Sequence, residues 1–173
     1  MVGYNTDAEG FQVAIQQGIR SYYSQNNASG VSNFDEKKNN RIKSAVCYGY
    51  GGVTSVVVAV LKSMGIEVYI TGRRPGAAQT RAEELGVEVF QCNHHTPDLF
   101  INASYPKNSN WANCDFNNQN SSDIIENINF HLGSYTVLSK IICEKMKSVD
   151  MKGSIVLLNS IYGIVAQDEE LYT

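Results

Sequence analysis

The chain of 173 residues and 19.1 kDa is long enough for one ordinary domain and short for two. Its 14 basic and 17 acidic side chains give a net charge of −3, which excludes the basic surface that a nucleic-acid-binding protein needs. Hydrophobic residues make up 43% of the chain, which excludes a disordered tail and allows a core. There is no apolar run of the roughly 18 residues that a membrane span requires, and the first residues lack the pattern of a signal peptide. We therefore expect a cytoplasmic protein with no nucleic-acid or membrane partner.

The first 43 residues are expected to form a leading helix and a loop. In residues 7–23, apolar side chains recur about one helical turn apart, as is typical of an amphipathic helix. Thr6 or Asp7 is the expected N-cap, because a side-chain oxygen there can accept a hydrogen bond from a free backbone amide. Residues 24–41 are rich in Asn, Ser and Gly, which indicates an exposed loop.

From residue 44 onward, short apolar segments alternate with longer helical ones. This alternation is typical of a parallel sheet with helices on both faces. Right-handed crossovers favour the strand order 3-2-1-4-5. The sequence therefore predicts an α/β fold, a Rossmann-like doubly wound parallel sheet of about five strands with an N-terminal helix. The expected strands are 44–49, 67–71, 87–91, 98–103 and 153–160, and the expected helices are 53–64, 76–85 and 121–148.

The expected helix 121–148 is the longest and carries apolar residues on more than one face, including Phe130 and Val137. Either it is an ordinary core helix, or a second helix packs on it, as in a homodimer; the sequence leaves both open. One side carries Ile124, Ile125, Ile128, Leu132, Tyr135, Leu138, Ile142 and Met146.

The turn after the first expected strand reads Gly49-Tyr50-Gly51-Gly52-Val53-Thr54. Gly49 permits a tight turn, Gly51 lets the backbone approach a pyrophosphate, and the helix that opens near Gly52 directs free amides at an anion. Thr54 stands where the pattern G-x-G-x-x-G has its third glycine, so the match is partial. The turn predicts a dinucleotide site, with a purely structural turn as the alternative.

The end of the second expected strand indicates which dinucleotide is preferred. The segment Thr71-Gly72-Arg73-Arg74-Pro75 has no acidic residue to hold the ribose 2′-hydroxyl of NAD. Two guanidinium groups suit the 2′-phosphate of NADP instead. The sequence predicts NADP in preference to NAD, with a solvated basic turn as the alternative.

The cysteines form no C-x-x-C pair and are expected to be free thiols, Cys47 in a strand and Cys143 in a helix. Cys92 lies close to His94 and His95, which suggests a metal site. Adjacent histidines cannot share one face of a strand, however, and no second ligand cluster is evident. A loop is the favoured interpretation, and no metal is expected.

Residues 3–12 (GYNTDAEGFQ) resemble the motif that leads into the cofactor domain of shikimate dehydrogenases. Residues 45–86, with the glycine turn and the two arginines, are similar to the NADP-binding half of that family. The resemblance covers about residues 3–92. It implies that Asp7 matches the aspartate that pairs with a catalytic lysine. That lysine belongs to a substrate domain that we do not expect in this chain.

The later part of the chain, residues 98–173, resembles the short-chain dehydrogenases/reductases instead. The stretch DLFINA at 98–103 is similar to the end of that family's fourth strand. The resemblance places Asn129 on the helix asparagine and Ser160 on the serine of the catalytic tetrad. The Tyr-x-x-x-Lys pair should follow, but Tyr172 has no lysine four residues on.

The sequence is therefore interpreted as one Rossmann-like domain, 1–173, with a shikimate-dehydrogenase-like half at 44–92 and a short-chain-reductase-like half at 98–173. This mosaic predicts an engineered or recombined NADP(H)-binding chimera of oxidoreductase type. The chain has the complete proton relay of neither family, so little or no turnover is expected. The expected catalytic residues, an incomplete set given by resemblance, are Asp7, Asn129 and Ser160. The expected cofactor-binding residues are Gly49, Tyr50, Gly51, Gly52, Val53, Thr71, Arg73, Arg74, Asn102 and Ala103.

Two alternatives stay open. One is a structural chimera that folds without useful cofactor affinity. The other is an active NADP-dependent carbonyl or shikimate-type reductase, whose acid comes from a partner chain or from a side chain such as Tyr105 or Lys107. Each expected catalytic residue also has a structural interpretation, Asp7 as an N-cap and Asn129 and Ser160 as partners of backbone groups.

Overall fold

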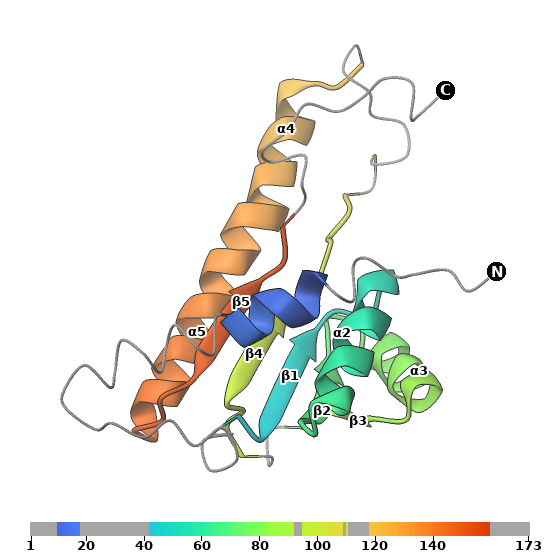
Figure 1. Cartoon of the computed structure of the whole chain (residues 1–173). Coiled ribbons are helices and arrows are strands. Elements are labelled where there is room, and N and C mark those ends of the chain that lie inside the picture. Colours follow the sequence, from blue (N-terminus) through green and yellow to red (C-terminus); the bar gives the residue numbers. More distant parts are fainter. Residues whose placement is uncertain (1–9, 18–41, 92–94, 109, 111–117, 160–173) are drawn as a thin grey trace.

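The computed structural model of the chain describes residues 10–17, 42–91, 95–108, 110 and 118–159. Five parallel strands form one sheet in the order β3-β2-β1-β4-β5 (Figure 1). This confirms the predicted α/β, Rossmann-like fold and its strand order. The strands are β1 (Ser44–Tyr48), β2 (Glu67–Thr71), β3 (Glu88–Val89), β4 (Leu99–Asn102) and β5 (Ser154–Leu157).

The helices connect the strands as the alternation predicts, and a helix at 10–17 precedes the sheet. Gly86 ends the second connecting helix in the left-handed conformation, with φ +59°. The expected continuous helix 121–148 was wrong in one respect, because a π-helical turn interrupts it. Apolar periodicity does not reveal such a turn. The helices are α2 (Gly52–Ser63), α3 (Pro75–Leu85), α4 (Ser121–Ile128), the π-helical η2 (Asn129–Gly133) and α5 (Ser134–Ser148).

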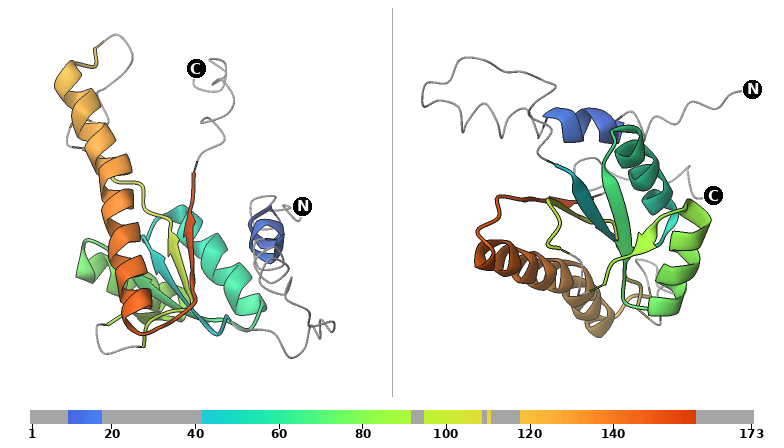
Figure 2. Two further views of the ribbon diagram at one scale, coloured as in Figure 1. Left: turned by 90° about the vertical axis from the view of Figure 1, so that its left-hand side faces the viewer. Right: turned by 90° about the horizontal axis from the view of Figure 1, so that it is seen from below.

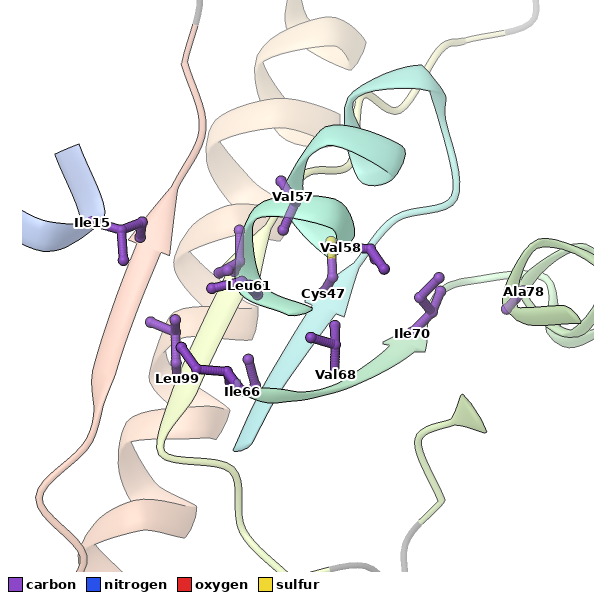
Figure 3. Packing of buried hydrophobic residues seen from close by; sticks show 12 residues of the cluster. Ile15, Cys47, Val57, Val58, Leu61, Ile66, Val68, Ile70, Ala78 and Leu99 are labelled. Carbon is purple, nitrogen blue, oxygen red and sulfur yellow. The ribbon is translucent and has the colours of Figure 1, made fainter. Parts of the chain in front are cut away.

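The two faces of the sheet bury separate apolar clusters. Alternate residues of β1 point to opposite faces, so that Cys47 packs beneath α2 while Val46 packs on the side of α5. Figure 3 shows the first cluster, in which Val57 and Leu61 of α2 lie over the strands. Burial raises the pKa of the Cys47 thiol to about 12, so this side chain behaves as a small buried apolar group.

Helices α4 and α5 form one long rod that runs past the sheet. Its α5 end packs on the sheet through Ile142 and Met146, whereas α4 extends beyond the carboxyl ends of the strands (Figures 1 and 2). The apolar side predicted for this helix therefore meets the core only along part of its length. Large apolar side chains left exposed on the rod are Ile124, Ile125, Ile128, Leu132, Val137 and Ile141.

At the opposite, amino edge of the sheet, Asp98 joins the beginnings of two strands. Its Oδ2 accepts hydrogen bonds from the backbone amides of Lys43 (2.8 Å) and Ser44 (3.0 Å). Nε2 of His95 lies 3.1 Å from Oγ of the same serine. The described residues contain no group of three or more possible metal ligands, and Cys92 and His94 lie outside them. No described helix combines the length and hydropathy of a membrane span.

Candidate functional site

The chain reverses its winding direction between β1 and β4, which are neighbours in the sheet. After β1 the chain continues into α2 on one face, and after β4 it continues toward α4 and α5 on the other. In open α/β sheets, ligands bind at such a switch point, outside the carboxyl ends of the strands. The loops after β1 and β4 are therefore the candidate site.

Gly49 brings these two loops into direct backbone contact. A Cβ on this residue would lie 2.9 Å from the carbonyl carbon and oxygen of Ala103, and its φ of +131° is one that other residues rarely adopt. Its amide donates to the Thr71 carbonyl (2.9 Å), and the Ala103 amide donates to the Tyr48 carbonyl (2.9 Å). The first glycine thus has a structural reason: it lets β1 and β4 end side by side.

The second and third glycines serve the beginning of α2. Gly51 is the N-cap, no side chain in the described part of the chain caps the helix, and its first turn holds no acidic residue. A Cβ at Gly51 or Gly52 would meet no described atom within 4 Å, and Val53 is 55% exposed. Thr54, in place of the usual glycine, is buried. Uncapped helix amides with open space around them have the chemistry of a phosphate site.

Arg74 lies against the glycine turn through Tyr50. Its Nε donates to the Tyr50 hydroxyl oxygen (2.9 Å), and its guanidinium carbon lies 5.5 Å from the centre of the ring. A Cβ on Gly72 would lie 2.7 Å from the Tyr50 ring, so only glycine allows this packing. Arg73 and Arg74 are both exposed, and the contacts with Tyr50 come from Arg74. Of the two predicted arginines, the structure therefore brings Arg74 to the turn.

Asn102 ends β4 as a fully buried polar residue. Its Oδ1 accepts hydrogen bonds from the Ser104 amide (3.1 Å) and hydroxyl (2.6 Å), while its buried Nδ2 has no hydrogen-bond partner among the described residues. A buried amide that donates to nothing costs free energy. Its position beside the glycine turn makes it a candidate ligand-binding donor.

Among the predicted catalytic residues, only Asn129 lies in the described part of the chain. It begins η2 and is exposed. Asp7 and Ser160 lie outside the described residues, so their roles stay predictions.

A cluster of three rings lies beyond the end of β4; the sequence pointed to Tyr105 as a possible acid but not to its ring neighbours. The ring of His131, in η2, has its centre 4.8 Å from that of Tyr105 and 6.2 Å from that of Tyr135. The Tyr135 hydroxyl donates to the Ser104 carbonyl, which ties α5 to the loop after β4. Burial lowers the pKa of His131 and raises the pKa of Tyr105, and the nearby Tyr135 adds to the latter shift. Because 26 residues separate Tyr105 from His131, no spacing in the sequence points to their contact.

The fold defines the class: a doubly wound α/β protein of the Rossmann type. No family model matches the chain. Over 95 residues it is 32% identical to the post-translational flagellin modification protein A of Campylobacter coli, an alignment that covers 54% of this chain and 37% of that protein. The chain thus spans little more than a third of that relative.

Solved structures similar to the chain include two described as shikimate 5-dehydrogenase or similar to it. The Thermus thermophilus enzyme, in complex with NADP(H) and shikimate, is 29% identical with a TM-score of 0.42, over 59% of this chain and 32% of that one. The shikimate 5-dehydrogenase-like protein HI0607 is 24% identical with a TM-score of 0.38, over 58% and 31%. With TM-scores below 0.5, we derive no function from these superpositions.

Proposed function

We propose that this chain is an NADP(H)-binding domain of oxidoreductase type. The observation that carries the proposal is the contact of Arg74 with Tyr50 beside the uncapped beginning of α2. It puts a guanidinium, which suits a 2′-phosphate, next to free amides, which suit a pyrophosphate.

The residues of this edge fit the dinucleotide. Gly51 and Gly52 leave room for phosphate over the helix amides. Arg74 and Arg73 would hold the ribose phosphate, and Asn102 would offer its unpartnered amide near the end of β4. Bound there, the cofactor would supply or accept a hydride. The domain limits 1–173, the mosaic of the two families, the chimeric origin and the low turnover stay predictions.

Calorimetric titration of the chain with NADP(H), and in parallel with NAD(H), tests the proposal. We expect micromolar binding with NADP preferred. Because a charge-assisted hydrogen bond contributes about 1.5–3 kcal/mol, Arg74→Ala should weaken NADP binding by about 10-fold or more while leaving NAD binding nearly unchanged.

Arg73→Ala is the matched control, since it removes the same charge from the neighbouring residue and keeps the contact of Arg74 with Tyr50. We expect it to weaken NADP binding less than Arg74→Ala does. Equal losses of affinity for NAD and for NADP in the Arg74→Ala variant would contradict the assignment of Arg74 to the 2′-phosphate. A cooperatively folded chain that binds neither dinucleotide would favour a structural chimera without cofactor affinity.

We also propose that the chain forms a homodimer through the long helical rod. Contiguous exposed apolar surface on a helix is typical of an interface. The first half of the rod, 121–133, carries two acidic and no basic side chains, whereas the second half, 134–148, carries three lysines and one glutamate. An antiparallel second copy would pair each half with its opposite charge, and such a two-fold arrangement is self-complementary.

A further inference from the structure

The cluster of Tyr105, His131 and Tyr135 has no part in holding the cofactor as proposed above. It nevertheless lies at the same edge of the sheet. Tyr105 stands three residues beyond Asn102, the last residue of β4, and β4 is the strand whose end touches the glycine turn. The rod places η2 beyond the carboxyl ends of the strands (Figure 1). Through its contact with the Tyr105 ring, the imidazole is thus held against the loop that follows β4.

The surroundings of His131 restrict the orientation of its ring and leave the imidazole accessible for proton exchange with a ligand. Among the described residues, its ring contacts are Tyr105, from the loop after β4, and Tyr135, from one turn further along the rod. The hydrogen bond from the Tyr135 hydroxyl to the Ser104 carbonyl fixes the position of the Tyr135 ring. The side chain is only half-buried, so a ligand can reach it. π-Helical turns occur frequently at functional sites, where they redirect a side chain.

We propose that His131 is the group that exchanges a proton with the substrate, and that the substrate class is a small alcohol or the corresponding carbonyl compound. The inference rests on the proposed function. In the oxidation direction, the hydroxyl proton passes to the unprotonated ring nitrogen of His131. NADP⁺, bound as proposed above, would accept the hydride that leaves the same carbon with its electron pair, and the carbonyl double bond would form. Reduction is the reverse, with the imidazolium as acid.

The direction of the His131 shift agrees with this role. Burial lowers its pKa, so at neutral pH the ring is mostly unprotonated and acts as a base. Acidic solution increases the imidazolium population, which favours the reduction direction.

An NMR titration of the histidine imidazoles in the full chain tests the proposal without a known substrate. The pKa of His131 is measured with saturating NADP⁺ and with saturating NADPH, and its signals are assigned with His131→Gln. NADP⁺ and NADPH have the same phosphates, but the nicotinamide ring of NADP⁺ carries one additional positive charge. If His131 faces that ring, we expect its pKa to be lower with NADP⁺ than with NADPH, by about 0.5 or more.

His95 is the internal control, because it lies beside Ser44 at the amino edge of the sheet and its imidazole signals should be the same in both complexes. An equal pKa of His131 in two saturated complexes would overturn the inference while leaving the proposed function intact. A folded chain that binds neither dinucleotide would overturn the proposed function, and this inference with it.

Discussion

At the scale of single residues, the three glycines of the turn after β1 have different physical reasons. Gly49 is required by its left-handed φ and by the backbone of Ala103. Gly51 and Gly52 have ordinary φ values and open surroundings. Among the described residues no atom lies where a Cβ at either position would stand, and the proposed cofactor would use this space. A sequence pattern cannot separate the two reasons.

The pair Gly49→Ala and Gly51→Ala separates folding from binding. Gly49→Ala should lower the free energy of unfolding by about 1–3 kcal/mol, because a Cβ in that strained conformation meets the Ala103 backbone. Gly51→Ala should cost less than about 1 kcal/mol, the range for an N-cap change. It should nevertheless weaken NADP binding, since the methyl group enters the space over the helix amides.

Urea unfolding followed by circular dichroism measures the stabilities, and calorimetry measures the binding. A Gly49→Ala variant as stable as the parent would refute the close-approach argument. A Gly51→Ala variant with unchanged NADP affinity would contradict the proposed position of the phosphate at the beginning of α2.

At the scale of elements, helix and strand boundaries follow local chemistry. Lys62 donates to the carbonyls of Leu85 (3.3 Å) and Gly86 (3.1 Å), which satisfies the end of α3. Asn120 caps α4 by accepting from the Asp123 amide (3.0 Å). At the beginnings of β1 and β4, the carboxylate of Asp98 accepts hydrogen bonds from the backbone amides of Lys43 and Ser44.

Asp98→Ala should lower the free energy of unfolding by about 1–3 kcal/mol, because it leaves the Lys43 and Ser44 amides without their acceptor. Asp98→Asn keeps one side-chain oxygen and is the conservative control, with a smaller expected loss. Urea unfolding of the three proteins measures the difference. If the alanine variant unfolds at the same urea concentration as the parent, water replaces the carboxylate without loss of stability. The hydrogen bonds of Asp98 then do not stabilise the sheet.

At the scale of the whole molecule, the structure is asymmetric. One face of the sheet is covered by α2 and α3, whereas on the other the rod contacts the sheet mainly through α5 (Figures 1 and 2). The exposed part of the rod includes Ile128 at 53% and Leu132 at 67% exposure. Such surface is typical of a face that meets another protein.

The double variant Ile128→Glu/Leu132→Glu should dissociate the proposed homodimer, because it buries two like charges in an apolar interface. Analytical ultracentrifugation should give twice 19.1 kDa for the parent chain and 19.1 kDa for the variant. Val13→Glu changes a side chain that is 50% exposed on the N-terminal helix and should remain dimeric. A monomeric parent at high protein concentration would contradict the proposal.

Local patterns in the sequence were enough to predict the strands, their order in the sheet and the glycine turn, but not the π-helical turn of the rod. Periodicity and glycine signals are local, and the handedness of crossovers then leaves few topologies for such a chain. The helix of residues 52–63 forms even though Val57 and Val58 are weak helix formers, because both are buried against the sheet.

Which side chains meet depends on the packing of the elements and could not be read from the sequence. The tertiary structure brought Arg74 rather than Arg73 to Tyr50, gave Gly49 its contact with Ala103, and placed His131 between two tyrosines. It also showed that the apolar side of the rod is largely exposed, where the sequence pattern alone fits a core helix equally well. Contacts between distant residues depend on how elements pack, and the periodicity of one segment carries no information on what lies opposite it.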